Sequence, residues 1–379
     1  MLLQEVLDRL EEWYPARFAD SWDAVGLVCG DPAAGVRRIL LAVDPVAVVA
    51  AEALAWDADL LVCHHPLLLK AVHGVPATTP KGRVLHRLLT GGCALFTAHT
   101  NADAPSGGVS ESLALALGLT DVQPLEADPR PPLDKLVAFA PVADAERIRE
   151  AIAAAGAGRL GDYDSCTFTS AGEGRFRPLD GAHPAIGEVG RPETVAEVRI
   201  ESVVPRHLRS RVVAALLAAH PYEEPAYDVI PLADLDDPAR GSGRVGRLGE
   251  PVSLRALAER VAGVLPPTAH GVRVSGDPDR PVETLALCGG SGDFLLDRAR
   301  AAGADAYLTS DLRHHPASEF REHDGPALLD VAHWAAEWIW LPVLRERLSG
   351  ALGDTVEVRV STTNTDPWTF RVDTREDRR

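Results

Sequence analysis

The spacing of apolar residues along the chain predicts a mixed α/β protein. Residues 2–10 carry apolar side chains at helical spacing with acidic residues between them. Three continuous apolar runs are typical of strands: RILLAVD (38–44), DLLVCHHP (59–66) and CALFTAHT (93–100). The segments between them, VAVVAAEALAW and GRVLHRLLTGG, have helical character. Strands that alternate with helices in this way predict a parallel or mixed sheet covered on both faces.

The same alternation returns near the carboxyl end of the chain, but the middle of the chain is different. The segments ETLALCGG, DAYLTSD and PALLDVAH predict strands, and FLLDRARAAG and EFREHDG predict helices. The middle segment lies between the Pro- and Gly-rich stretches EADPRPP and DLDDPARGSG. It reads as strand, helix, a Gly-rich stretch without clear periodicity, strand, helix and strand, which favours the β-α-β-β-α-β order of a ferredoxin-like domain.

The fold class that follows is α/β, with an α/β domain in two parts and an inserted ferredoxin-like α+β domain. We predict that residues 1–130 and 234–379 form the first domain and that residues 131–233 form the insert. A chain of 379 residues exceeds the size at which single cores usually stop growing, which agrees with two domains.

Composition and charge narrow the class of protein. With 46% hydrophobic and 25% charged residues the chain is ordinary for a globular protein. A net charge of −17 argues against binding to nucleic acid or to anionic lipid, since such surfaces carry clustered Lys and Arg. No stretch approaches the roughly 20 apolar residues that span a bilayer. Five scattered cysteines without CxxC spacing, and an amino terminus unlike a signal peptide, predict a cytoplasmic protein.

Histidines and carboxylates follow several of the predicted strands. His64 and His65 end the second strand, and His99 with Asp103 follow the third. Groups just past the carboxyl ends of parallel strands share one edge of the sheet, where such folds place ligands. Near the end of the chain, His333 ends another predicted strand.

Glu337 follows His333 at i, i+4 spacing, which puts both side chains on one face of a helix. A lone pair of this kind is more often a surface or capping pair. The segment SDLRHH, with Asp311, His314 and His315, could equally be a solvated loop before a charged helix. Several imidazoles and carboxylates at strand ends would nevertheless make a poor neutral core, so we favour a metal site.

The types of candidate ligand indicate the kind of metal. Imidazoles and carboxylates without thiolates suit zinc, iron, manganese or cobalt. The residues exceed the needs of one tetrahedral ion, and a carboxylate can bridge two ions, so a dinuclear site is the natural expectation. The segment CGGSGD (288–293) suggests either a turn whose exposed amides hold a phosphate or a tight turn capped by Ser291 or Asp293.

These motifs together resemble the GTP cyclohydrolase 1 type 2 homologues, the Nif-three-like dinuclear metal-centre proteins, in their longer bacterial form. The resemblance covers nearly the whole chain. It rests on the following features in one order: WDAVGLVCG, the strand end at Asp44, DLLVCHHPLLL, AHTNADAPSGGV, HPYEEPAYDV, GSGRVGRLG, CGGSGD, DAYLTSDLRHH and DVAHWAAE.

The resemblance implies a set of site residues and an assembly. The implied ligands of two divalent metal ions are His64, His65, Asp103, His333 and Glu337. The histidines implied to line the same pocket, and our candidates for catalytic proton transfer, are His99 and His315. The resemblance also implies that the insert is PII-like and that the chain forms a homo-oligomer, namely a ring-like hexamer.

Two functions are consistent with these expectations. The first is a metal-dependent hydrolase acting on a nucleotide or phosphoester, in which two ions polarise an electrophile and lower the pKa of a water between them. The alternative is a non-catalytic metal-binding or regulatory scaffold, whose PII-like insert senses a small ligand.

Overall fold

The computed structural model describes residues 1–372 of the chain. The chain divides into two compact units. The first unit combines Met1–Asp128 with the chain from Pro238 onward, and the second unit is Pro129–Asp237. The second unit is therefore inserted in the sequence of the first, between two neighbouring strands of one sheet, β5 (Thr120–Pro129) and β10 (Asp236–Ser253).

The first unit contains a five-stranded sheet with the order β1-β4-β3-β2-β15. Its strands are β1 (Gly26–Cys29), β2 (Arg38–Ala42), β3 (Leu60–Cys63), β4 (Ala94–Thr97) and β15 (Glu357–Val360). The four strands from β4 to β15 are parallel, and β1 joins β4 in the antiparallel sense. The carboxyl ends of β2, β3 and β4 therefore lie at one edge of this sheet.

Side-chain alternation on these strands builds a core on each face of the sheet. In β3, Leu61 and Cys63 pack with α2 (Ala47–Ala55) and α3 (Pro80–Thr90), while Leu60 and Val62 face a second, larger core. Helix α3 begins as its sequence suggests, because the Thr79 hydroxyl accepts a hydrogen bond from Gly82 N–H and Pro80 follows as the first helical residue. Both faces of the sheet are covered, as predicted for strands that are apolar throughout.

A six-stranded sheet in the same unit has the order β11-β14-β13-β12-β10-β5. Besides β5 and β10 its strands are β11 (Val272–Ser275), β12 (Pro281–Ser291), β13 (Ala306–Ser310) and β14 (Ala327–Val331). Strands β12, β13 and β14 are parallel, so their carboxyl ends also share one edge. The helices that follow or flank them are α8 (Leu254–Val264), α9 (Leu296–Ala301) and α10 (His314–Arg321).

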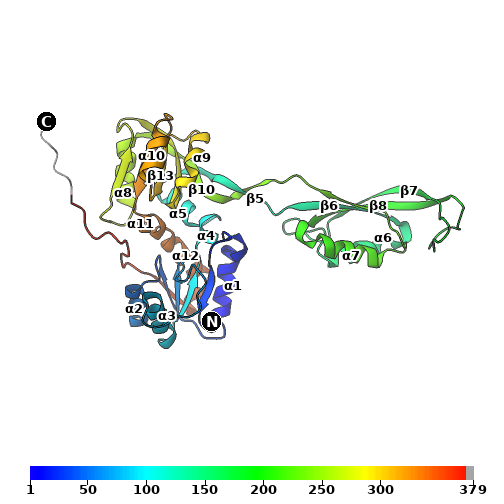
Figure 1. Ribbon diagram of the computed structural model, residues 1–379, viewed down its shortest axis with the longest axis horizontal. Helices are drawn as coiled ribbons and strands as arrows, with labels where there is room; N and C mark the ends of the chain where they lie inside the picture. Colours follow the sequence, from blue (N-terminus) through cyan, green and yellow to red (C-terminus); the bar gives the residue numbers. More distant parts are fainter. Residues whose placement is uncertain (373–379) are drawn as a thin grey trace. The chain divides into compact units, whose positions relative to one another are not determined.

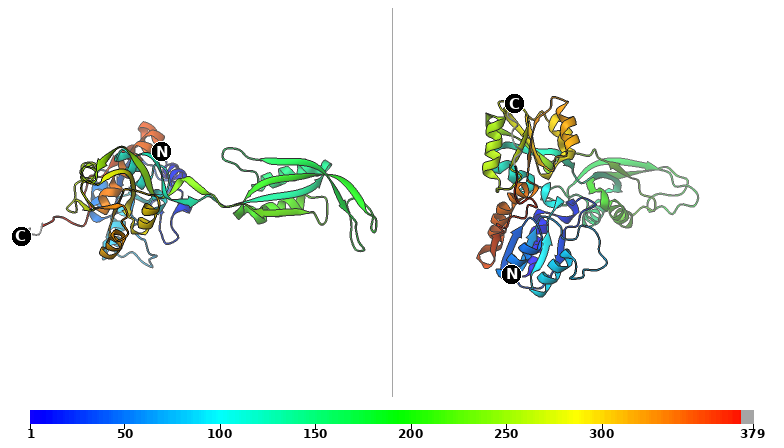
Figure 2. Two further views of the ribbon diagram at one scale, coloured as in Figure 1. Left: turned by 90° about the horizontal axis from the view of Figure 1, so that it is seen from above. Right: turned by 60° about the vertical axis from the view of Figure 1, so that its left-hand side comes forward.

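The two sheets of the first unit share one continuous core. In Figure 1 the helices in the middle of this unit lie between the blue elements near the amino terminus and the yellow and orange elements of the second sheet, and the right-hand view of Figure 2 shows these two sets of elements apart as well. These middle helices are α4 (Thr100–Asp103), α5 (Val109–Ala116), α11 (His333–Trp338) and α12 (Trp340–Leu352). The core also receives one face of α1 (Leu3–Trp13) through Leu3, Val6 and Leu10.

The second unit is a four-stranded antiparallel sheet with two helices against one face. Its elements in chain order are β6 (Leu133–Pro141), α6 (Ala145–Ala154), β7 (Thr167–Phe176), β8 (Glu193–Pro205), α7 (Arg209–Ala219) and β9 (Tyr227–Pro231). The sheet order is β7-β8-β6-β9. This is the β-α-β-β-α-β connectivity of split-βαβ folds.

Some local features differ from the sequence-based expectations. Strand β3 ends at Cys63, so His64 and His65 follow the strand instead of ending it. The Gly-rich stretch of the middle segment contains β7, whose mostly exposed residues include Gly172 and Gly174 and leave no apolar pattern to detect. Helix α10 begins at His314, earlier than EFREHDG predicts.

The expectation of a turn at CGGSGD was wrong, because β12 continues to Ser291. The Gly289 amide donates to Ser110 Oγ at 3.2 Å, and neither Ser291 nor Asp293 caps a helix with its side chain. The remaining short 3-10 helices are Ala16–Phe18, Val142–Asp144, Arg206–Leu208, Asp293–Leu295 and Gly353–Thr355. Among the helices described in residues 1–372, none has the length and apolar character needed to cross a bilayer.

Candidate metal centre

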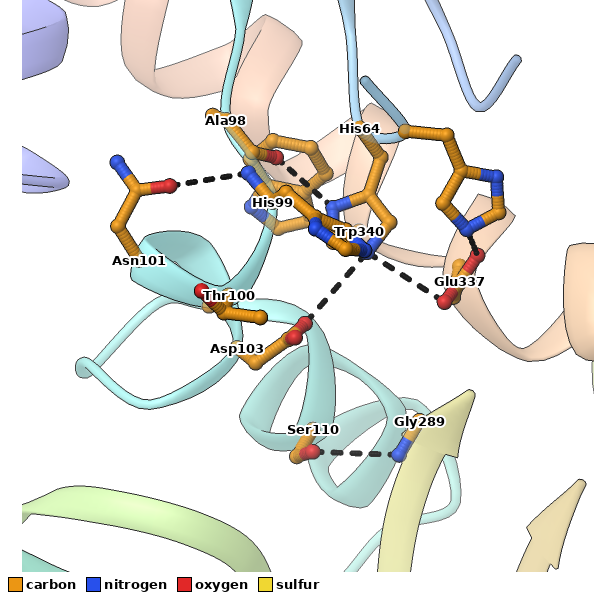
Figure 3. A network of polar contacts seen from close by, with 12 residues as sticks. His64, Ala98, His99, Thr100, Asn101, Asp103, Ser110, Gly289, Glu337 and Trp340 are labelled. Atoms are coloured by element: carbon orange, nitrogen blue, oxygen red, sulfur yellow. Dashed lines mark hydrogen bonds and ion pairs between the residues drawn. The ribbon is translucent and has the colours of Figure 1, made fainter. Parts of the chain in front are cut away.

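Four histidines and two carboxylates from both sheets of the first unit converge on one partly buried cluster. Figure 3 shows His64, His99, Asp103 and Glu337 of this cluster. His64 and His65 follow β3, and His99 follows β4. His64 continues the side of β3 that carries Leu60 and Val62, so its ring is only 1% exposed and lies against Trp340. His333 opens α11 directly after β14, as expected from its position at a strand end.

Glu337 lies among three of these imidazoles. Its Oε1 atom is 2.7 Å from Nε2 of His333 and 3.4 Å from Nε2 of His64, and its Oε2 atom is 3.0 Å from Nε2 of His65. The Glu337 side chain is 4% exposed. Because its i, i+4 partner His333 is in the same helix, α11 aims both groups at the ends of β3 and β4.

Each of the four histidines is oriented through its Nδ1 atom by an oxygen that can only accept. His64 faces the Ala98 carbonyl at 2.9 Å, and the other three face carboxylates. The carboxylate contacts are His65 with Asp44 (2.7 Å), His99 with Asp23 (2.8 Å) and His333 with Asp311 (2.6 Å). Nδ1 therefore carries a hydrogen in every ring, and the neutral ring presents the Nε2 lone pair to the cluster.

Three of the inward-facing atoms have no hydrogen bond that would explain their positions. His64 Nε2, Asp103 Oδ1 and Glu337 Oε2 are buried without a hydrogen-bond partner among the described residues, although His64 Nε2 and Asp103 Oδ1 are 3.6 Å apart. Lone pairs of imidazoles and carboxylates that face one another repel unless a cation lies among them. The donor set thus fits divalent metal ions.

The pKa values of the cluster show that its histidines bind protons when no other cation is present. Burial alone would lower the pKa of His65, but the Glu337 carboxylate and the hydrogen bond to Asp44 raise it to about 11. For His333 burial is likewise outweighed by Glu337 and Asp311, and its pKa rises to about 10. Burial opposes ionisation of Glu337, yet His65 and His333 hold its pKa well below the usual range. Glu337 is therefore ionised at neutral pH.

Two overlapping groups have their ligand atoms within 4.8 Å of one another. One is His64, His65 and His99, and the other is His65, His333 and Glu337. Asp103, at the end of α4, approaches the first group through His64. The structure does not bring His315 into these groups, since it lies exposed in the first turn of α10 with its ring against His314.

Gly290 leaves the space that Glu337 and His333 occupy. A Cβ atom at this position would lie 2.6 Å from Glu337 Oε1 and 3.2 Å from His333 Nε2, and the residue has a φ of +73°. The CGGSGD segment thus contributes to the cluster through the missing side chain of Gly290.

Arg244 anchors the chain that follows Asp103. Its buried guanidinium donates to the carbonyl oxygens of Ala104 (2.8 Å) and Pro105 (3.0 Å) and lies 3.3 Å from Glu111. The motif GSGRVGRLG therefore supports the loop between α4 and α5. Nothing in its spacing linked it to the histidines.

The chain after β15 approaches the cluster from outside. The Thr365 hydroxyl donates to Oδ2 of Asp44, whose Oδ1 accepts from His65. Ser361 Oγ and Thr363 Oγ1 both donate to Glu52 in α2. This segment fixes the carboxylate that orients His65. The sequence did not indicate that Thr365 contacts Asp44 or that Asp23 orients His99, because the two residues of each pair lie far apart in the sequence.

Comparisons with known proteins agree with the resemblance seen in the sequence. The model of the Duf34/NIF3 (NGG1p interacting factor 3) family matches residues 1–367. The chain is 49% identical to the GTP cyclohydrolase 1 type 2 homolog of Mycobacterium tuberculosis, covering 99% of this chain and 98% of that protein. It is 36% identical to the protein of the same name from Bacillus subtilis, covering 97% and 98%.

Solved structures give the same result. The crystal structure of a Bacillus cereus protein related to NIF3 has a TM-score of 0.74 and 34% identity, covering 98% of this chain and 99% of that one. A Staphylococcus aureus protein has a TM-score of 0.83 and 26% identity with the same coverage.

Metal binding at pH 8 should release protons. His65 and His333, with pKa values of about 11 and 10 without metal, are protonated at this pH, and an ion must displace the protons from Nε2. Metal affinity should therefore rise as the pH rises towards 10. Zinc or manganese titrations in buffers of different ionisation enthalpy should show a net release of protons, because the pKa values of His64, His65 and His333 are all raised. Binding enthalpies that are the same in every buffer would contradict this assignment.

Substitution of Gly290 by alanine should lower the affinity for metal by more than about tenfold, because the added methyl group displaces Glu337. The purified variant should therefore contain less metal than the unchanged protein. Gly303→Ala is a matched control. Gly303 has a similar φ of +68°, but a Cβ atom there meets nothing within 4 Å. Both variants share the backbone strain, and only Gly290→Ala should lose metal in elemental analysis. Equal losses would show that strain alone is responsible.

Proposed function

The chain belongs to the Duf34/NIF3 family, and from this premise we propose that it is a dinuclear metal-dependent hydrolase acting on a nucleotide or another phosphoester. The observation that supports the proposal most strongly is the buried Glu337 carboxylate, which faces three Nε2 atoms without hydrogen-bond geometry at Oε2. A buried arrangement of this kind requires cations.

The proposed ligands are His64, His65, Asp103, His333 and Glu337. His65 belongs to both groups of converging ligand atoms, and Glu337 reaches imidazoles of both, which supports two adjacent ion positions. Imidazole nitrogens and carboxylate oxygens, without a thiolate, suit zinc, iron, manganese or cobalt. Cys63 is buried in the core on the other face of β3 and is not proposed as a ligand.

Divalent ions in such a site act as Lewis acids that polarise a phosphoryl oxygen and lower the pKa of water. The protein contributes orientation and proton transfer. His99 is held by Asp23, which also accepts hydrogen bonds from the Thr100 amide and hydroxyl. The Nδ1 hydrogen of His99 is thus fixed, and its Nε2 atom can accept or return a proton at the cluster.

The proton relay is therefore assigned first to His99. His315 is the second candidate, and its exposed position in α10 places it outside the converging groups. A phosphate is the proposed guest because its oxygens can contact two ions at once. Since the chain is strongly acidic, affinity for such an anion must come from the ions rather than from the surrounding surface.

The second candidate function is a metal-binding or regulatory scaffold without catalysis. In this view the second unit, whose β-α-β-β-α-β connectivity is that of ferredoxin-like domains and agrees with a PII-like insert, would sense a small ligand. A pocket confined to this unit supports the view. The two functions differ in one respect, which is turnover by the metal-loaded protein.

Hydrolysis should be slow, metal-dependent and abolished by loss of the ligands. We expect the protein loaded with manganese, cobalt or zinc to hydrolyse at least one member of a panel of nucleotides, cyclic nucleotides and phosphoesters. Asp103→Ala and Glu337→Gln should remove the activity, whereas Glu346→Gln, which changes an exposed carboxylate on α12, should retain it. Survival of every compound with the metal-loaded protein would favour the scaffold.

The chain should form a homo-oligomer, which we propose is a hexamer with closed symmetry. The insert should be dispensable for metal binding, because all five proposed ligands lie outside Pro129–Asp237. Arg130 N–H donates to the Leu235 carbonyl at 2.7 Å, so residues 131–234 can be replaced by an Asn-Gly turn.

Light scattering of the full chain and elemental analysis of the shortened chain test these statements separately. A stable monomer at micromolar concentration would contradict the assembly. Loss of metal from a shortened chain that still unfolds cooperatively would contradict the independence of the metal centre from the insert.

A further inference from the structure

The second unit contains a cavity of about 650 Å³ that lies on the face of its sheet opposite the two helices. The pairing register places Phe139, Arg199, Ser170 and Glu197 on this face, because residues directly opposite one another in an antiparallel pair point to the same side. Residues of the loop between β7 and β8 also line the cavity. Its volume is in the range of cavities that bind small molecules.

A buried carboxylate lies at this cavity. Glu197 is 9% exposed, and within residues 1–372 its carboxylate accepts one hydrogen bond, from the Tyr222 hydroxyl at 2.9 Å. Burial and the nearby Glu197 raise the pKa of Tyr222, so the phenol keeps its proton and remains the donor. One neutral donor is little compensation for a buried carboxylate.

The backbone is arranged to admit this carboxylate. A Cβ atom at Gly174 would lie 2.2 Å from Glu197 Oε2, so no larger residue fits at that position without moving Glu197. Tyr222 is fixed by His220, whose Nε2 donates to the Phe139 carbonyl and whose Nδ1 accepts from the Tyr222 amide. The position of the carboxylate is therefore determined by its neighbours on both sides.

Aromatic rings line the cavity that contains the carboxylate. Phe176 and Tyr222 are in ring contact with centroids 5.9 Å apart, whereas the Phe139 ring has the Arg199 guanidinium over it, 5.9 Å from the ring centroid. Aromatic faces next to a carboxylate form a setting that favours an organic cation, because the rings attract the charge and also contact the apolar part of a ligand.

The arginines of the cavity do not neutralise Glu197. Arg199 pairs with Glu201 at 2.9 Å, and Arg175 pairs with Glu173. Arg177 also lines the cavity, on the exposed loop side, as do Glu223 and Glu224. Four carboxylates and three guanidinium groups therefore line the site, and among them Glu197 is the buried one.

We propose that this cavity binds a small organic cation, an amine or guanidinium-type compound with an apolar body, through Glu197 and the rings of Phe176 and Tyr222. The bound cation supplies the charged donors that Glu197 lacks in the protein alone. The proposal concerns the second unit by itself, and it holds or fails independently of hydrolysis at the metal centre.

Three probes of nearly equal size and different charge test the proposal on the full chain: benzamidinium, neutral benzamide and anionic benzoate. Titration calorimetry should show saturable binding of benzamidinium at millimolar concentration, with benzamide and benzoate at least about tenfold weaker. If benzamide or benzoate binds as tightly, or if benzamidinium produces no saturable heat, the proposal is wrong. This comparison requires no mutation.

Glu197→Gln keeps a hydrogen-bond acceptor for Tyr222 but removes the charge, and it should weaken benzamidinium binding about tenfold or more. Glu201→Gln is the matched control. Glu201 lies on the same strand and the same face and pairs with Lys135 and Arg199, and it does not line the cavity. Circular dichroism and melting temperature of the full chain verify that both variants are folded.

Unchanged affinity in a folded Glu197→Gln variant, or equal losses in the two variants, would overturn the role of Glu197. A crystal structure of the full chain soaked in benzamidine is a further test of the proposal. It should place the amidinium against Glu197, and a cavity filled instead by a side chain of a second copy would overturn the proposal.

Discussion

The interaction on which the first unit depends is the approach of one buried carboxylate to three imidazoles. Glu337 can be ionised in the interior only because His64, His65 and His333 direct their Nε2 atoms at it. These rings in turn are fixed by acceptors at Nδ1, so their orientation is set before any cation binds. A cluster of this kind is costly without a cation, and that cost explains why so much of the surrounding structure is devoted to holding it.

The architecture of the first unit supplies this cluster from both of its sheets. The carboxyl ends of β3 and β4 carry His64, His65 and His99, and the end of β14 leads directly into α11. Because the two sheets share one continuous core, the two sets of strand ends are held together by packing as rigid as the rest of the interior. The acceptors Asp44 and Asp311 also follow strands, one in each sheet. The second unit has its own core and its own cavity, and the residues that form them lie outside this cluster.

The sequence by itself determined the α/β class, the family and most of the elements that carry the cluster. Apolar runs in β2, β3, β13 and β14 are strong signals because these strands are buried on both faces. The residue types and spacings of HHP, HTNAD and HxxxE were enough to nominate the candidate ligands. The strand β7 gave no signal, because its exposed, Gly-containing sequence has no apolar face to reveal a period.

Only the tertiary structure decided which acceptor orients each histidine ring and which glycine leaves space for a neighbouring side chain. Asp23 and His99 are 76 residues apart, and Thr365 and Asp44 are 321 residues apart, so no local pattern connects them. The use of Gly290 is equally invisible in the sequence, since a glycine in CGGSGD suggests a turn, whereas the structure uses its missing side chain to admit Glu337. His315 is the opposite case. Its position in the motif DAYLTSDLRHH suggested that it lines the site, but the structure leaves it exposed on α10. Spacing specifies which side chains can share a strand end or a helix face, but contacts between distant segments depend on how the two sheets pack.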